Sequence, residues 1–278
     1  VLTAGYGMHS QMQPLYQYFA YLPGNPRGYM ANYNVDFTRS HHAVAGYEHT
    51  LGRALRLRTE VYGQYLYNVP VELRTGSSYS ALNQGSTFSR NFPDTLQNTG
   101  TGYNYGIELT LEKTFGRGFY TLFTTSVFNS QAAGNDGIYR STDYNTRYAI
   151  NLLGGYERKM GKYSTFTAGG KVTTIGGKLY SPVDIAASNA RGDMVVIDSM
   201  RNSQRFRPYF RADVKLGMRF NAQRLTHEVA VDLVNVTSQK NIMSLVYSSD
   251  LAAQGLSYPF FTQYQLGFLP IFYYRIDF

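Results

Sequence analysis

The sequence predicts an all-β fold: a transmembrane antiparallel up-and-down β-barrel, of which this chain supplies about ten strands. Three observations favour this class. Segments throughout the chain alternate apolar and polar residues with the period of two that strands have. The connections between them alternate between short and long. Aromatic residues reach 15% of the chain and gather near strand ends, as in the interfacial girdles of such barrels.

The alternating segments predict ten strands. The clearest is YFRADVKLGMRF, where Phe210, Leu216 and Phe220 share one face while Arg211 and Lys215 share the other. Two segments, 119–131 and 145–158, alternate less cleanly and leave their faces unassigned. The expected strands cover residues 1–11, 34–48, 53–68, 104–115, 119–131, 145–158, 164–176, 208–220, 226–240 and 262–278.

The lengths of the connections indicate how the strands are arranged. Short turns are expected near 49–52, 116–118, 159–163 and 221–225, and long polar loops near 12–33, 69–103, 132–144, 177–207 and 241–261. Outer-membrane barrels have this layout, with short turns at the periplasmic end and long loops outside. The alternative is a large soluble β-sandwich or propeller, whose strands are usually shorter and whose loops do not sort by length onto one end.

Composition narrows the function classes. The net charge is +8, yet there is no basic run of five or more, which argues against nucleic-acid binding. The absence of Cys excludes disulfides and thiolate metal sites, and no apolar run approaches the ~18 residues of a membrane helix. The first residues lack the features of a signal peptide and lie inside a strand-like alternation, so we expect the true beginning of the polypeptide elsewhere.

No catalytic motif is present: the sequence has no GxSxG, no HExxH and no phosphate-binding loop, so an enzyme is not expected. The adjacent His41 and His42 fall on opposite faces of a predicted strand, so they predict no metal site. No cofactor is expected either.

Several stretches resemble the C-terminal end of TonB-dependent outer-membrane receptors, most of all those of Bacteroidota. They are HEVAVDLVNVTSQKNIMSLVY with QLGFLPIFYYRIDF near the end, and YNYGIELTLEKTFGRGFYTLFTTSVFNSQ in the middle. GYGMHSQMQPLYQYF, GGKLYSPVDIAAS and PYFRADVKLGMRF are similar in style to the same family, so the resemblance spans essentially all 278 residues.

The resemblance implies a 22-stranded barrel with a plug domain inside, of which residues 1–278 form the last ten strands. The plug, the TonB box and the first half of the barrel are absent from this sequence. The implied function is active uptake of a scarce nutrient across the bacterial outer membrane, driven by TonB acting on the plug. The implied partners are outer-membrane lipid and lipopolysaccharide, the remainder of the receptor with its plug, TonB through the missing N-terminal part, and a surface lipoprotein.

Three groups of candidate residues follow. Extracellular loops are expected to bind the ligand, because binding groups concentrate on loops over rigid scaffolds; they carry Tyr79, Asn83, Arg90 and Asp94 in one loop and Asp184, Asn189, Arg191 and Asp193 in another. Charged residues on polar strand faces are expected to face the lumen or the plug: Arg56, Arg58, Glu60, Glu108, Glu112, Arg211, Asp213, Lys215, Arg219, Glu228 and Asp232. The apolar face of the last strand resembles the family's assembly signal: Phe272, Tyr274, Ile276 and Phe278.

Other interpretations remain open at this point. The charges on the polar faces also fit a solvated barrel wall whose cross-strand pairs contribute a few tenths of a kcal/mol each. The chain also fits a self-contained ten-stranded outer-membrane enzyme, a protease or lipase with His9, Asp36 and His41 at its rim. A passive porin and a structural or adhesive barrel are the remaining alternatives.

Overall fold

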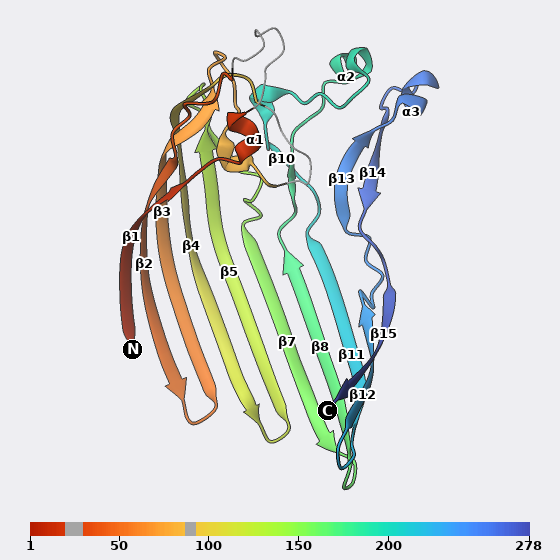
Figure 1. Ribbon diagram of the computed structural model, residues 1–278. Coiled ribbons are helices and arrows are strands. Elements are labelled where there is room, and N and C mark those ends of the chain that lie inside the picture. Colours follow the sequence, from red (N-terminus) through yellow and green to blue (C-terminus); the bar gives the residue numbers. More distant parts are fainter. Residues whose placement is uncertain (20–29, 87–92) are drawn as a thin grey trace.

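A curved antiparallel sheet dominates the computed structural model, which describes residues 1–19, 30–86 and 93–278 (Figure 1). Ten long strands follow one another in the order of the chain, and the short β6 (Tyr139–Ser141) pairs with β5. The long strands are β1 (Leu2–Gln11), β2 (Thr38–Leu51), β3 (Leu55–Glu72), β4 (Leu96–Gly116), β5 (Phe119–Ala133), β7 (Tyr148–Lys159), β8 (Ser164–Ile175), β11 (Tyr209–Asn221), β12 (Thr226–Val234) and β15 (Leu269–Asp277).

Each of the ten predicted strands corresponds to one of these long strands, which confirms the predicted meander. Some boundaries were wrong. β4 begins at Leu96 rather than at 104, because the upper part of β3 extends the ladder with Val71 opposite Gln97. β12 ends at Val234 rather than at 240, because Asn235 has a φ of 53° and begins a turn.

The predicted last strand, 262–278, is in fact two strands. β14 (Phe260–Tyr264) pairs with β13 (Ile242–Tyr247) in a separate hairpin, and β15 begins only at Leu269. A second small ribbon joins β9 (Leu179–Tyr180) to β10 (Gln204–Arg205). The long connection 241–261 therefore contains ordered structure, including the helix α3 (Ser249–Ala253).

Tight turns lie at one end of the sheet and long connections at the other, as the hairpins in Figure 1 show. The β4–β5 turn is the shortest, with Arg117 at a φ of 55° and Gly118 at 84°. Two successive positive φ values are typical of the two-residue hairpin loops whose twist matches that of the strands. A Cβ on Gly118 would also lie 2.8 Å from the carbonyl oxygen of Glu157, so this position needs glycine.

One face of the sheet exposes a band of large apolar side chains, called the apolar face below. Val61, Ile107 and Val127 are direct neighbours across β3, β4 and β5, and each is about half exposed. At the other side of the sheet Met218, Val229 and Tyr274 are neighbours across β11, β12 and β15. A continuous apolar face of this extent is typical of a surface that meets lipid.

The well-buried apolar core is small and lies beneath the long connections. Val69 and Val71 at the top of β3 are fully buried, and Leu82 and Ala81 pack near them from the short helix η1 (Ala81–Asn83). The other helices are α1 (Leu15–Tyr18), α2 (Ile185–Arg191) and η2 (Asp198–Met200). Within the described ranges, none of the helices has the length and hydrophobicity that a membrane crossing requires.

β1 and β15 form the two edges of the large sheet and lie at opposite sides of the molecule in Figure 1. Every residue of β1 pairs with β2, and every residue of β15 pairs with β12, so one side of each edge strand is satisfied. Hydrogen-bonding groups on the other side of an edge strand need partners in lipid, where water does not supply them.

Candidate functional site

The polar face of the sheet, opposite the apolar face, carries charged residues in complementary sets. At the first half of the sheet Arg56 bonds Glu112 across β3 and β4 at 2.6 Å, and Arg58 bonds Glu60 along β3 at 2.7 Å. Glu60 is also directly opposite Glu108, so two carboxylates face each other in the ladder. Like charges in this position repel one another and favour a cation between them.

The second half of the sheet repeats the arrangement. Arg219 lies opposite Glu228 and Lys215 lies opposite Asp232, each with 3.8 Å between charged atoms. Along β11 itself Arg211 bonds Asp213 at 2.9 Å. All eleven charged residues that the sequence placed on the polar strand faces therefore lie on one face of the sheet, and most of them form ion pairs with one another.

A recess of about 660 Å³ lies on this polar face, between strands β2 to β5 and the connections above them. Carboxylates line its lower part and amides and hydroxyls line its upper part, while Leu82 and Tyr144 reach into it from the connections. The sequence predicted Glu60 and Glu108 on the polar face but did not predict the recess, because its roof comes from connections distant in the chain. The lining also includes His42, Val44, Tyr62, Gln64, Asn104, Phe128, Ser130 and Thr142.

Tyr62 forms one wall of the recess because the strand opposite carries glycine. Gly106 pairs with Tyr62 across β3 and β4, and a Cβ there would lie 2.8 Å from the Tyr62 hydroxyl and 2.8 Å from Cβ of Phe128. The ring therefore lies across the strand beside Phe128. Above it, Asn104 donates to Gln64 at 2.7 Å, and Gln64 donates to Ser40 at 3.3 Å. The upper recess is thus a preformed row of amides and hydroxyls.

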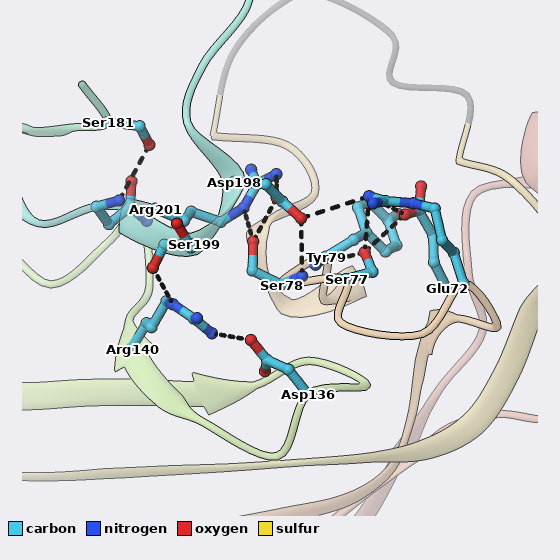
Figure 2. A network of polar contacts seen from close by, with 12 residues as sticks. Glu72, Ser77, Ser78, Tyr79, Asp136, Arg140, Ser181, Asp198, Ser199 and Arg201 are labelled. Atoms are coloured by element: carbon cyan, nitrogen blue, oxygen red, sulfur yellow. Dashed lines mark hydrogen bonds and ion pairs between the residues drawn. The ribbon is translucent and has the colours of Figure 1, made fainter. Parts of the chain in front are cut away.

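A second feature is a network of polar contacts that joins the long connections, centred on Asp198 of η2 (Figure 2). Its carboxylate accepts from the backbone N–H of Ser78 at 3.1 Å and from the Ser78 hydroxyl at 2.5 Å. Arg201 donates to the same carboxylate at 2.8 Å, and Arg74 lies 3.4 Å from it. Residues 120 positions apart in the chain are thereby held together.

These contacts change the acid–base properties of the network. Burial alone would raise the pKa of Asp198, but hydrogen bonds from Ser78 and Arg201 stabilise the charged form and lower it to about 2. Burial alone would lower the pKa of Arg74, but the carboxylates of Glu72 and Asp198 raise it. Both shifts favour the charged forms of Asp198 and Arg74, and each of these charges is opposed by a partner of the other sign.

Tyr79 lies beneath the network and is almost fully buried. Burial raises the pKa of its hydroxyl to about 12, against the opposing effect of hydrogen bonds from Gln84 and Gln17. The Gln17 amide donates to this hydroxyl at 3.3 Å from the β1–β2 connection. Tyr79 was predicted as a ligand-binding residue, and the structure places it inside the loop packing.

The other residues predicted in the first loop have mixed positions. Asn83 accepts from the backbone N–H of Asp143 at 2.9 Å and so joins two connections. Asp94 is exposed and accepts from the backbone N–H of Thr95. Arg90 lies outside the described residues.

The residues predicted in the second loop lie together at α2, on its exposed side. Asp184 caps the N-terminus of α2 by accepting from Ala187 N–H at 2.9 Å, and Asn189 accepts from the Tyr247 hydroxyl at 3.1 Å. Arg191 ends the helix and Asp193 accepts from the N–H of Met194. The structure does not bring this group to the first loop: the contact is made instead by Ser78, Asp198 and Arg201, which no local sequence pattern distinguishes.

The three rim residues of the enzyme interpretation do not form a catalytic set. His41 lies on the apolar face, where its Nδ1 is 2.7 Å from the Tyr6 hydroxyl and its ring stacks on Tyr67. His9 pairs with Ser40, the neighbour of His41 in β2, and therefore points to the opposite face. Asp36 bonds Arg39 and Asn68 before β2 begins.

The C-terminal residues lie on the apolar face and are exposed. Phe272 and Tyr274 pair with Val231 and Val229 of β12, and the exposed fractions of Phe272 and Phe278 are 79% and 99%. The Tyr274 hydroxyl lies 2.7 Å from Nδ1 of His227, and the two rings stack. On the opposite face of β15, Arg275 bonds Asp277 at 2.6 Å.

Among solved structures the chain is similar to outer-membrane receptors and transporters. It matches the ferric-catecholate import receptor Fiu of Escherichia coli K12 (TM-score 0.53, 17% identity, 87% of this chain and 29% of that one). It matches the ferric yersiniabactin uptake receptor FyuA of Yersinia pestis (TM-score 0.55, 14% identity, 100% of this chain and 34% of that one). It also matches the outer-membrane transporter YddB of E. coli (TM-score 0.59, 12% identity, 99% of this chain and 38% of that one). No family model and no curated protein matches.

These likenesses establish the fold: the sheet has the architecture of part of an outer-membrane β-barrel. At identities of 12–17% they carry the architecture and not the ligand. The chain spans about a third of the length of each of these three solved proteins.

Proposed function

We propose that this chain is the C-terminal part of the barrel of a TonB-dependent outer-membrane receptor of the Bacteroidota type, which takes up a scarce nutrient. The observation that carries the proposal is the large open sheet with a lipid-type apolar face, which covers about a third of receptors and transporters of the same fold. The short turns then lie at the periplasmic end, and the long connections lie outside the cell.

The polar face in this proposal lines the lumen and meets the plug. Glu60 and Glu108 support this assignment, because they face each other at the foot of the recess. Arg58 bonds Glu60, while Glu108 has a serine hydroxyl at 3.4 Å and no ion-pair partner among the described residues. A cationic side chain from the remainder of the receptor fits between the two carboxylates, and would be displaced when the plug moves.

Ligand binding is assigned in this proposal to the outer connections. Asp184, Asn189, Arg191 and Asp193 are exposed in and around α2, and the β3–β4 connection carries the exposed Asp94 and the half-buried Asn83. TonB acts through the part of the receptor outside this chain. Outer-membrane lipid and lipopolysaccharide meet the apolar face, and a surface lipoprotein is the partner proposed for the outer end. Phe272, Tyr274, Ile276 and Phe278 serve as the signal for barrel assembly.

The first test is the mass of the intact native polypeptide that carries this sequence. A receptor with a plug and a complete barrel has a mass near three times the 31.4 kDa of this chain, given that the chain covers 29–38% of the solved proteins. A mass near 31.4 kDa would reject the proposal, because no plug would accompany the barrel. With the larger mass, uptake into cells that lack TonB is expected to fail while binding at the surface persists.

A further inference from the structure

We propose that three of the long connections form one interlocked unit, the rim cap, which opens as a whole and controls access to the recess on the polar face. The rim cap comprises residues 73–86, 134–147 and 176–208. Separate loops, each free to move alone, are the usual expectation for connections at the end of a sheet. The contacts described next favour a single unit instead.

Each pair of connections in the rim cap is joined directly. Ser78 binds Asp198, which joins the first connection to the third. Asn202 donates to Asp143 at 2.6 Å and to the carbonyl of Ser141 at 2.9 Å, which joins the third to the second. Asp143 in turn donates from its backbone to Asn83 of the first. The contacts therefore close a ring, so that the loss of any one joint destabilises the closed state of the whole unit.

Further contacts strengthen the joint between the second and third connections. Arg140 bonds Asp136 at 2.6 Å within its own connection and donates to the carbonyl of Ser199 at 3.2 Å in the next (Figure 2). Both side chains of that ion pair are largely buried. Arg205 donates to the carbonyl of Asn145 at 2.8 Å. Charge-assisted bonds that are shielded from water hold more strongly than exposed ones.

The first and second connections also approach closely at one glycine. A Cβ on Gly134 would lie 2.5 Å from the carbonyl oxygen of Ser77 and 2.8 Å from Cα of Ser78. Both contacts are with backbone atoms, so even an alanine forces the two connections apart. Gly134 and Asp198 thus hold the rim cap from two different connections.

The rim cap roofs the recess. Leu82 from the first connection and Tyr144 from the second line its upper side, and the Tyr144 hydroxyl donates to the carbonyl of Gln84 at 2.7 Å. The β13–β14 hairpin stands apart from this unit in Figure 1; the described side chains link the two through Lys178 with Met243 and Tyr247 with Asn189. That the roof faces outward rests on the proposed function, whereas the unity of the rim cap does not.

Limited trypsin cleavage of the purified intact polypeptide in detergent tests whether the rim cap is one unit. The reporter sites are Arg74, Arg140 and Arg201, one in each connection, and cleavage is located by mass spectrometry. Asp198→Ala is expected to speed cleavage at Arg140 by roughly tenfold, although Arg140 does not touch Asp198, because cleavage follows the open population. Gly134→Ala is expected to do the same at Arg201.

The matched control is Asp184→Ala, an acidic residue of the same connection that caps α2 and whose side chain forms no hydrogen bond or ion pair with the other two connections among the described residues. It is expected to affect only cleavage at Arg191. The milder Asp198→Asn keeps the size of the side chain and removes only its charge. It is used if Asp198→Ala fails to fold, which heat-modifiable gel mobility shows. Faster cleavage confined to the mutated connection in both Asp198 and Gly134 variants would overturn the proposal.

Access to the recess is measured with a maleimide on a cysteine placed at Tyr62, since this chain contains none of its own. Labelling is expected to accelerate in the Asp198→Ala and Gly134→Ala backgrounds together with cleavage. Unchanged labelling would show that the rim cap does not control the recess. The same assays on whole cells separate the rim-cap proposal from the proposed function. Cleavage that occurs in detergent but not on cells would reject the outward orientation of the connections, while the proposal that the rim cap is one unit would stand.

Discussion

Glu60 of β3 and Glu108 of β4 lie directly opposite each other on the polar face, and Arg58 contacts only the first of them among the described ion pairs. Charge repulsion at such a position lowers stability unless a further cation is present. We interpret the pair as a site prepared for a positive group from the remainder of the proposed receptor. A single substitution tests this interpretation, because the direction of the resulting change in stability shows whether a positive group meets Glu108.

Glu108→Gln is expected to lower the free energy of unfolding of the intact polypeptide by about 1–3 kcal/mol, because the cation it meets would lose its partner. The measurement is the denaturant midpoint at constant m-value. If no cation meets Glu108, the same change relieves repulsion and raises stability by a few tenths of a kcal/mol. Glu112→Gln is the control, since its partner Arg56 lies within this chain at 2.6 Å.

Asp198 predicts an acid-labile rim cap. Its folded-state pKa of about 2 lies below the ordinary value of 3.8, so the stabilisation it supplies is complete above pH 4 and is lost as the pH falls toward 2. Because the side chain is partly exposed, we expect a modest effect on protein stability and a clear local one. Hydrogen exchange of residues 74–86 between pH 5 and pH 2 measures it. Asp198→Asn is expected to remove the pH dependence, and a wild-type profile in that variant would contradict the assignment.

The apolar face predicts a difference between two lysine substitutions on neighbouring strands. Ile107 of β4 faces the apolar side at mid-strand, and Thr124 of β5 pairs with Thr110 on the polar side. Ile107→Lys is expected to cost about 2–4 kcal/mol in a folding assay in lipid vesicles, as for a charge near the bilayer midplane. Thr124→Lys is expected to cost less than about 1 kcal/mol. Equal costs would mean that neither face meets lipid.

The two edge strands predict how the isolated chain behaves. β1 and β15 each pair on one side only, and an unpaired edge in lipid is costly. The isolated 278-residue chain is therefore not expected to insert as a stable ten-stranded barrel. Refolding in detergent, followed by gel electrophoresis with and without boiling, provides the measurement. A heat-modifiable band from this chain alone would contradict the expectation and favour a self-contained barrel.

Phe278 predicts an effect on assembly rather than on function. It is almost fully exposed at the end of the apolar face, where the structure gives it no packing role. Under the proposed function, deleting it is expected to lower the amount of folded protein in the outer membrane several-fold while leaving the folded fraction normally stable. Tyr273→Phe, on the opposite face of β15, serves as the control. Normal outer-membrane levels after deletion would remove Phe278 from the assembly signal.

The sequence by itself determined the sheet and its two faces. Alternation in β3, β4, β11 and β15 was enough, because the side chains of a strand point to opposite sides in turn and only one side meets lipid. The tight turns were equally readable. The short turn predicted near 116–118 is the two-residue β4–β5 loop, where Arg117 and Gly118 both have positive φ values. Where alternation continued by chance, the prediction was wrong: residues 262–278 read as one strand although Tyr264 pairs with Ile242 in a separate hairpin.

Tertiary structure decided the sites. Ser78 and Asp198 are 120 residues apart, and nothing in either local sequence indicates that the two meet. Leu82, Tyr62 and Tyr144 form one recess only because β3 pairs with β4, β4 with β5, and the connections fold back over them. Local patterns record which way each side chain points along its own strand. Contacts between loops depend on the path of the backbone between strands, which leaves no periodic trace in the sequence.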